Sequence, residues 1–128
     1  MAIVLVGHGS IGSRYKAEII EKYNDIDLYI VDNKDSVLEE LSKNGIKCFK
    51  NLDELKKEKK EITHGIIANW GPDHITTANH LIDIGCKRLI IEKPLSNRKD
   101  ELQNLKKKNF KGKHIYYDPS SFFLHKYC

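Results

Sequence analysis

Short apolar runs alternate along the chain with segments in which apolar residues recur at helical spacing. Each run is apolar at nearly every position, which is typical of strands covered on both faces of a sheet. The helical segments between the runs favour a chain that crosses over the sheet after each strand. The runs that predict strands are residues 3–6, 28–31, 46–49, 65–68, 88–91 and 114–117.

Helices are expected between these strands. Apolar residues recur at every fourth position from Ile11 to Tyr23 and predict one apolar stripe along the first helix. A second stripe runs from Ile75 to Ile82, and Gly85 marks the end of its helix. Three more helices are expected, at residues 37–41, after an N-cap at Asn51 or Asp53, and after an N-cap at Asn97.

This alternation of strands and helices predicts the fold class. Parallel strands joined by right-handed crossovers place helices on both faces of the sheet. We therefore expect an α/β fold, a doubly wound parallel-sheet Rossmann dinucleotide-binding domain. A chain of 128 residues has room for one such core. The domain is expected to span residues 1–117, with residues 118–128 as a short divergent tail.

Three glycines follow the first predicted strand in the spacing G-x-G-x-x-G. Gly7 permits the sharp turn out of the strand, Gly9 leaves room for a pyrophosphate, and Gly12 lets the helix pack closely on the sheet. The helix N-terminus then offers unpaired N–H groups to the phosphates. This context predicts a dinucleotide site, and a purely structural turn is the alternative. The other loop residues expected at the cofactor are His8, Ser10 and Ile11.

A carboxylate stands where a ribose-binding acid is expected. Asp32 lies twenty positions after Gly12, at the end of the second predicted strand, and Asn33 follows it. An acid at this position accepts both hydroxyls of the adenine ribose and repels a 2′-phosphate, so NAD is favoured over NADP. The neighbouring Lys34 weakens that preference, and NADP stays possible.

Two other classes of nucleotide-binding loop fit less well. A Walker-type phosphate loop is excluded because no G-K-[ST] follows the glycines. Nucleoside-binding methyltransferases share the layout of a glycine loop after the first strand and an acid after the second. Their first strand usually carries an acid, whereas Val4 and Leu5 supply none here.

Two further stretches, residues 68–74 and residues 92–95, stand at the ends of the fourth and fifth predicted strands. Ligands of open α/β sheets bind at the carboxyl ends of the strands, so we expect both stretches to meet at the nicotinamide. In the first, Asn69 is expected to hydrogen-bond the cofactor and Trp70 to flank its ring. Ala68 and His74 are further binding candidates. The two stretches read Ala68-Asn69-Trp70-Gly71-Pro72-Asp73-His74 and Glu92-Lys93-Pro94-Leu95.

With these motifs, the sequence resembles the glucose-fructose oxidoreductase and inositol dehydrogenase family (Gfo/Idh/MocA). The triplet Glu92-Lys93-Pro94 matches the most specific motif of that family in full. The resemblance implies that Lys93 is the catalytic residue and aids proton transfer, that Glu92 helps to place the cofactor, and that Pro94 belongs to the same loop. In the other stretch, where the family usually shows T-P-[ND]-x-x-H, only His74 matches.

The resemblance also implies an activity. Members of the family are NAD(P)-dependent oxidoreductases that transfer hydride between nicotinamide and a sugar, sugar nucleotide or polyol. A second domain supplies most of their substrate pocket, and the sequence given has no counterpart of it. Hydride transfer needs the reacting atoms within about 3–3.5 Å, so we expect cofactor affinity with little or no turnover from this chain alone. The alternative is a non-catalytic nucleotide-binding remnant or a partner-binding module, and a homo-oligomer is possible in either case.

Composition narrows the classes of protein to which the chain could belong. Apolar residues make up 40% and charged residues 31% of the chain, and no apolar stretch is long enough to cross a bilayer, so the cytoplasm is expected and a membrane is not. Lysine carries most of the net charge of +4, and its clusters at 56–60 and 106–108 predict solvated helix faces rather than nucleic-acid contacts. Cys48, Cys86 and Cys128 form no C-x-x-C pair, so neither disulfides nor a metal site are predicted.

Overall fold

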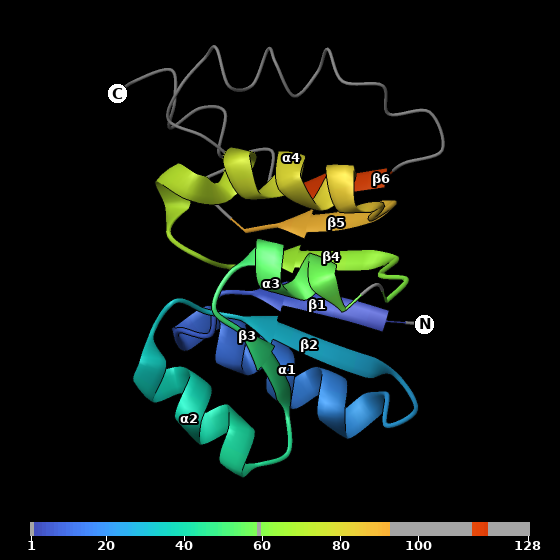
Figure 1. Cartoon of the computed structure of the whole chain (residues 1–128). Helices are drawn as coiled ribbons and strands as arrows, with labels where there is room; N and C mark the ends of the chain where they lie inside the picture. Colours follow the sequence, from blue (N-terminus) through green and yellow to red (C-terminus); the bar gives the residue numbers. More distant parts are fainter. Residues whose placement is uncertain (1, 59, 93–113, 118–128) are drawn as a thin grey trace.

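The computed structural model of the chain describes residues 2–58, 60–92 and 114–117. These residues form one six-stranded sheet in the order β3-β2-β1-β4-β5-β6, and every neighbouring pair of strands is parallel (Figure 1). The predicted doubly wound parallel sheet is confirmed. The strands are β1 (Ala2–Val6), β2 (Asp27–Val31), β3 (Lys47–Phe49), β4 (His64–Ile67), β5 (Arg88–Ile91) and β6 (His114–Tyr117).

Helices pack on both faces of the sheet and enclose two separate apolar cores (Figure 1). Successive strand residues point to opposite faces. Val4 and Val31 therefore join the core under α3 and α4, whereas Leu5 and Ile30 join the core under α1 and α2. The helical elements are α1 (Ser10–Lys22), α2 (Asp35–Lys43), α3 (Leu52–Lys57), the 3₁₀ turn η1 (Gly71–Asp73) and α4 (His74–Ile84).

The strand order reverses at the centre of the sheet, between β1 and β4. Val6 of β1 pairs with Val31 on one side and with Ile67 on the other. Just beyond these pairs, the Gly7 N–H donates to the Val31 carbonyl oxygen at 2.8 Å, and the Ala68 N–H donates to the Val6 carbonyl oxygen at 2.8 Å. The loops after β1, β2 and β4 therefore leave the sheet at one level, which is where doubly wound sheets form their ligand crevice.

Helix α1 differs from its prediction. Ile19 is buried, but Ile11 and Tyr23, at the two ends of the predicted stripe, are 43% and 53% exposed. Tyr15 is only half-buried. The buried residue of the first turn is Gly12, because the helix approaches the end of β1 so closely that its backbone makes the contact.

Strand β5 also departs from the prediction of cover on both faces. Leu89 and Ile91 are buried in the core under α4, whereas Arg88 and Ile90 on the opposite face are exposed. The core under α1 and α2 reaches Ile66 of β4 but includes no residue of β5, so among the described residues this helical layer does not bury Arg88 or Ile90.

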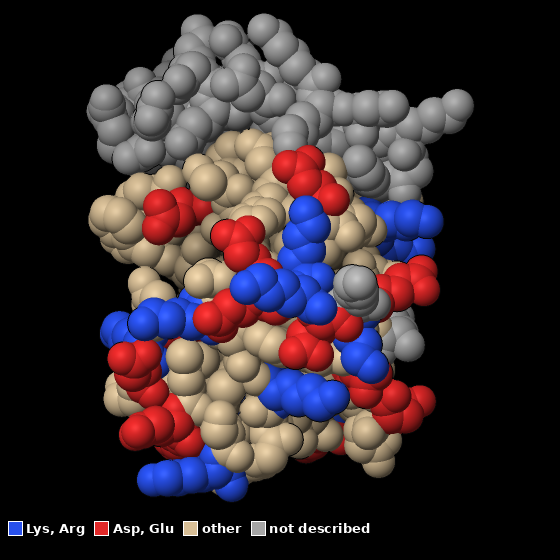
Figure 2. Space-filling view, in the orientation of Figure 1, with Lys and Arg blue, Asp and Glu red and all other residues tan. Residues whose placement is uncertain are grey.

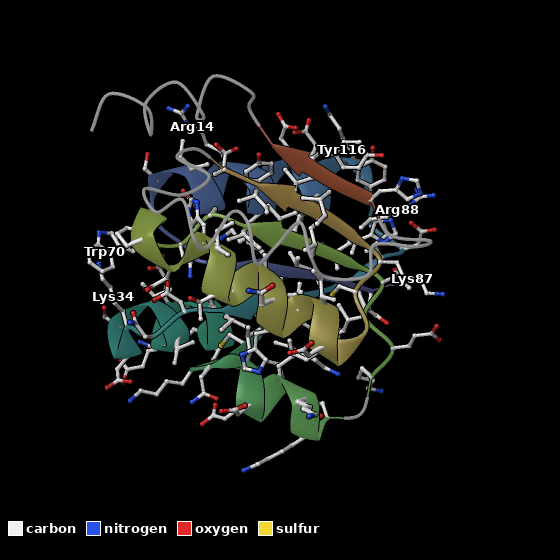
Figure 3. The ribbon with its side chains drawn as sticks, turned by 90° about the horizontal axis from the view of Figure 1, so that it is seen from above. Arg14, Lys34, Trp70, Lys87, Arg88 and Tyr116 are labelled. Atoms are coloured by element: carbon white, nitrogen blue, oxygen red, sulfur yellow. The ribbon has the colours of Figure 1, made fainter. Side chains whose placement is uncertain are left out.

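The surface carries charges of both signs. On the face in Figure 2, basic side chains are interspersed with acidic ones. Lys56 and Lys57 of α3 are exposed, as predicted for a solvated helix face. Figure 3 shows Lys34 and Trp70 on the side where the strands end, and Arg88 on the opposite side, where the strands begin. Within the part of the chain that the structure describes, no helix has the length and apolar character needed to cross a membrane.

Candidate functional site

Two glycines of the loop after β1 are required by close packing. Gly7 has a φ of +97°, and a Cβ placed there would lie 2.6 Å from the carbonyl oxygen of Ala68. A Cβ on Gly12 would lie 1.9 Å from the carbonyl oxygen of Gly7. Both distances are far shorter than any van der Waals contact, so these positions exclude a side chain and hold α1 against the ends of β1 and β4.

Gly9 is different, because a Cβ placed there would meet no atom within 4 Å. Gly9 is the N-cap of the 13-residue helix α1, and no side chain caps the helix. The first turn contains no acidic residue. The first N–H groups of a helix have no intrahelical acceptor, and the helix dipole adds a partial positive charge. An open space before such a terminus fits a phosphate group.

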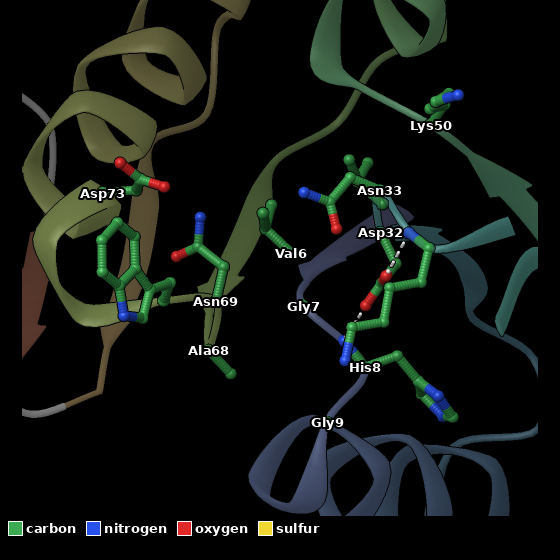
Figure 4. Close-up of a pocket in the computed structure, with 13 residues that line it drawn as sticks. Val6, Gly7, His8, Gly9, Asp32, Asn33, Lys50, Ala68, Asn69 and Asp73 are labelled. Carbon is green, nitrogen blue, oxygen red and sulfur yellow. Dashed lines mark hydrogen bonds between the residues drawn. The ribbon is translucent and has the colours of Figure 1, made fainter. Parts of the chain in front are cut away.

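Asp32 is held beside this helix start by two backbone hydrogen bonds. Its Oδ2 accepts from the His8 N–H at 2.8 Å, and its Oδ1 accepts from the Lys34 N–H at 2.9 Å (Figure 4). The first bond links the loop after β1 to the end of β2. Each carboxylate oxygen retains a lone pair for another donor. The carboxylate is therefore oriented by the fold before any ligand arrives.

The His8 ring lies at the same corner of the site. Burial lowers the pKa of its imidazole, and the nearby positive charge of Lys16 lowers it further, while Asp32 and Glu40 act in the opposite direction. The Nε2 atom of His8 is buried without a hydrogen-bond partner. The neutral imidazole is therefore favoured near neutral pH.

A crevice of about 440 Å³ opens between the loops after β1, β2 and β4. Ligand sites in proteins commonly have volumes of about 300–1,000 Å³. Figure 4 shows Asn69 and Asp73 on one side of the crevice, Asp32, Asn33 and Lys50 on the other, and Gly9 between the two sides. The lining residues are Val6, Gly7, His8, Gly9, Val31, Asp32, Asn33, Lys34, Lys50, Ala68, Asn69, Trp70 and Asp73.

Asn69 is fixed by contacts with α4. Its Nδ2 donates to the Thr77 hydroxyl at 2.9 Å, and its backbone carbonyl accepts from Nε2 of the buried His74 at 2.8 Å. The side-chain oxygen, Oδ1, is buried without a hydrogen-bond partner. A buried acceptor without a donor costs free energy, so this oxygen suits a ligand that supplies a hydroxyl or N–H group.

Eight of the predicted binding residues line the crevice, whereas others lie outside it. Ser10 and Ile11 begin α1 and are exposed outside the lining. His74 supports the Asn69 backbone instead of lining the crevice. Glu92 lies just beyond β5, where its Oε1 accepts a hydrogen bond from the Tyr15 hydroxyl. The eight that line it are Gly7, His8, Gly9, Asp32, Asn33, Ala68, Asn69 and Trp70.

Five lining residues were not among the predicted site residues: Val6, Val31, Lys34, Lys50 and Asp73. Lys50 directly follows β3, and Asp73 ends the 3₁₀ turn before α4. Lys50 could have been found from its place at the carboxyl end of a parallel strand, but the strand at 46–49 was too short to give that position weight. The predictions that fall outside the described residues are those on Lys93 and Pro94, the helix after Asn97, the cluster at 106–108, the tail at 118–128 and Cys128.

Among the described residues, neither the cysteines nor the side chains that could bind a metal ion form a second site. Cys86 is buried, and burial raises the pKa of its thiol to about 12, so the thiol stays protonated. Cys48 is half-buried and close to the Ser42 hydroxyl, with 3.4 Å between sulfur and oxygen. Among residues 2–58, 60–92 and 114–117, no three His, Cys, Asp or Glu side chains gather as metal ligands.

Comparison with known proteins agrees with this geometry. Residues 1–117 match the model of the GFO_IDH_MocA family, described as an oxidoreductase family with an NAD-binding Rossmann fold. No curated protein sequence matches the chain significantly.

Solved structures share the fold at low sequence identity. The myo-inositol 2-dehydrogenase from Lactobacillus plantarum is 18% identical, with a TM-score of 0.80 over 100% of this chain and 38% of its own. The WlbA dehydrogenase from Chromobacterium violaceum, solved with NADH and UDP-GlcNAcA, is 18% identical, with a TM-score of 0.78 over 92% of this chain and 34% of its own. A probable dehydrogenase from Thermotoga maritima is 21% identical, with a TM-score of 0.77 over 91% of this chain and 35% of its own.

The chain therefore spans little more than a third of the length of these dehydrogenases. What it shares with them is the fold. A match over 117 of 128 residues is enough to settle the family. The chain belongs to the Gfo/Idh/MocA oxidoreductase family and contains its NAD-binding Rossmann domain.

Proposed function

We propose that the crevice binds NAD in preference to NADP, as the cofactor half of an oxidoreductase that acts on a sugar, sugar nucleotide or polyol. The observation that carries the proposal is the open space at Gly9 beside a preoriented Asp32, in a loop whose other two glycines are packed shut. No packing contact of the fold requires a glycine at position 9, whereas a phosphate group at that place would need the open space.

The adenosine end of the cofactor is assigned to the β2 side of the crevice. The two Asp32 oxygens, each already oriented by one backbone N–H, would accept the two ribose hydroxyls. The negative charge of Asp32 disfavours a 2′-phosphate. Lys34 and Lys50 line the same side and reduce that discrimination. Because Lys50 Nζ also lies 3.6 Å from Asp35 Oδ1, its charge is partly offset, and NAD remains the preferred cofactor.

The diphosphate is assigned to the N-terminus of α1. The uncapped N–H groups after Gly9 point to this space, and the absence of an acidic residue in the first turn avoids charge repulsion. A phosphate here would satisfy the unpaired donors and leave the packed contacts of Gly7 and Gly12 unchanged.

The nicotinamide end is assigned to the β4–β5 side. The unpaired Oδ1 of Asn69 would accept a hydrogen bond from the cofactor, and the 72% exposed Trp70 offers an apolar face at the rim. NAD supplies hydride transfer when it is bound. The assignment of proton transfer to Lys93, beside Pro94, rests on the Glu92-Lys93-Pro94 triplet and its resemblance to the family motif.

The substrate class rests on the comparisons. One similar structure is a myo-inositol dehydrogenase, and another was solved with UDP-GlcNAcA. Myo-inositol and UDP-GlcNAcA both carry hydroxyl groups on a ring. We propose the same chemistry, oxidation or reduction at a ring hydroxyl or carbonyl, for the oxidoreductase to which this domain contributes.

Calorimetric titration of the purified chain with NADH and NADPH tests the cofactor assignment. We expect NADH to bind at least about tenfold more tightly than NADPH, a difference of about 1.4 kcal/mol. Asp32→Asn should weaken NADH binding and bring the two affinities together, because it removes the charge and one acceptor. Asp25→Asn, an exposed carboxylate away from the crevice, is the matched control and should change neither.

Two results would contradict the proposal. Affinities no better than about millimolar for both cofactors would leave only a non-catalytic remnant or a partner-binding module. If Asp32→Asn keeps the same ratio of NADH to NADPH affinity, the carboxylate does not hold the ribose.

A further inference from the structure

We infer that Tyr15 is a positioning residue for the nicotinamide half of the cofactor and acts through Glu92. The inference rests on the proposed function and extends it to a residue of α1 that does not line the crevice. It follows from one long-range contact and from where that contact lies in the sheet.

The contact joins two elements that are distant in the sequence. Tyr15 follows Gly12 by one helical turn, and its hydroxyl donates to Oε1 of Glu92, which is 77 residues later in the chain. Glu92 is also held through its backbone, because its N–H donates to the Ile67 carbonyl oxygen of β4 at 3.0 Å. Both the main chain and the side chain of Glu92 are therefore fixed at the carboxyl edge of the sheet.

The hydroxyl remains a donor over the whole working pH range. Burial, together with the hydrogen bond to Glu92 and the negative charges of Glu92 and Glu18, raises the pKa of Tyr15 to about 12. A phenol that stays protonated beside a carboxylate makes a charge-assisted hydrogen bond, which is stronger than a bond between neutral groups. This bond favours one orientation of the carboxylate.

The Tyr15–Glu92 contact lies on the side of the crevice proposed for the nicotinamide half of the cofactor. With the adenosine at the end of β2 and the diphosphate at the start of α1, the other half of a dinucleotide must extend over β4 and β5, because the strand order reverses there. Glu92 begins the segment after β5, next to the β4 loop that carries Asn69.

A carboxylate at that point can only accept hydrogen bonds. The matching donors on the nicotinamide half are the ribose hydroxyls and the carboxamide N–H group. By holding Oε1, Tyr15 favours one placement of the remaining acceptor positions of Glu92, so the acceptor is oriented before the cofactor binds and less side-chain entropy is lost on binding.

Tyr15→Phe tests the inference, since it removes the hydroxyl and keeps the ring. NADH and ADP are the two probes, because ADP contains the adenosine and diphosphate but lacks the nicotinamide half. We expect the Kd for NADH to rise about tenfold and the Kd for ADP to change less than about twofold. Tyr23→Phe, at the exposed end of the same helix, is the control and should change neither affinity.

A double-mutant cycle separates positioning from a general effect on the fold. If Tyr15 acts through Glu92, then Tyr15→Phe should have no further effect on NADH affinity in a Glu92→Ala background. Thermal unfolding of each variant, followed by circular dichroism, establishes that the variants compared are folded.

The possible failures are distinct. If Tyr15→Phe leaves NADH affinity unchanged, or weakens NADH and ADP equally, Tyr15 does not position the nicotinamide half, and the proposed cofactor site still stands. Additive effects of the two substitutions would show that Tyr15 does not act through Glu92. If the unmodified chain binds neither probe, the proposed function fails and the inference falls with it.

Discussion

At the scale of single residues, the three loop glycines are needed for different reasons. Gly7 and Gly12 lie in contacts that a Cβ would violate, at 2.6 Å and 1.9 Å from backbone oxygens. Gly9 has ordinary backbone angles, with φ at −87°, and open space around it. The fold therefore explains two of the glycines, and the proposed phosphate site would explain the third.

Substitution of these glycines should separate stability from binding. Gly9→Ala should cost less than about 1 kcal/mol of stability, the size of a helix-cap effect, and should weaken NADH binding at least about tenfold because its methyl group occupies the phosphate space. Gly12→Ala should destabilise the domain by about 3 kcal/mol, since the helix must move away from β1. Urea unfolding and calorimetry measure the two effects. Equal loss of stability in both variants would contradict this division.

At the scale of elements, the short helix α3 has a reciprocal N-terminal cap. The Asn51 side chain accepts from the Glu54 N–H at 2.9 Å, and the Glu54 carboxylate accepts from the Lys50 N–H at 3.1 Å. Asn51 is thus the cap, whereas Asp53 lies 3.4 Å from the His80 ring. Because Lys50 both follows β3 and belongs to this cap, the cap also fixes the main chain of a crevice residue.

Removal of the cap should lower stability by a predictable amount. We expect Asn51→Ala to reduce the free energy of unfolding by about 1 kcal/mol, because it leaves the Glu54 N–H of the first turn without its acceptor. Urea denaturation provides the measurement. Asn24→Ala, at an exposed turn position, should change the free energy by less than about 0.5 kcal/mol. A similar effect of both variants would exclude the cap as the cause.

At the scale of the whole molecule, two histidines at opposite ends of β1 are expected to make the stability depend on pH. His8 follows β1, and His64 pairs in β4 with Ile3 near the beginning of β1. Burial lowers the pKa of both imidazoles below 6.5, with Lys16 adding to the effect at His8, and Arg88 and the chain N-terminus at His64. The folded protein therefore binds protons at these rings less readily than the unfolded chain does.

This difference determines the sign of the pH dependence. Between the lowered pKa values and 6.5, the unfolded chain holds more protons, so the free energy of unfolding should fall as the pH decreases through 6.5 and rise again on return to neutral pH. Urea denaturation at about pH 7.5, 6.5 and 5.5 measures the trend. The double variant His8→Gln, His64→Gln should flatten it. An unchanged slope in that variant would assign the effect to other groups.

Much of this protein could be predicted from local patterns. The apolar runs identified all six described strands to within one residue at each end, and the G-x-G-x-x-G spacing located the turn between β1 and α1. Asp32 was found because it ends a strand at the expected distance from the glycines. These signals depend on neighbouring residues, since backbone conformation and strand burial are encoded over short stretches.

Other features depend on residues that the sequence keeps apart. The uneven burial of α1 and β5 follows from which helix covers which half of the sheet, and periodicity alone does not contain that information. Lys50 and Asp73 enter the crevice only because the ends of β3 and β4 lie at the same edge.

The sequence by itself determined the fold class, the glycine loop and the acid after β2, because each is a short-range pattern of residue type and spacing. Only the tertiary structure decided that Gly9 alone of the three loop glycines faces open space, that the Asn69 oxygen lacks a partner, and that Tyr15 holds Glu92. Contacts of this kind join residues up to 77 positions apart, and they form only when packing of the sheet brings distant elements together.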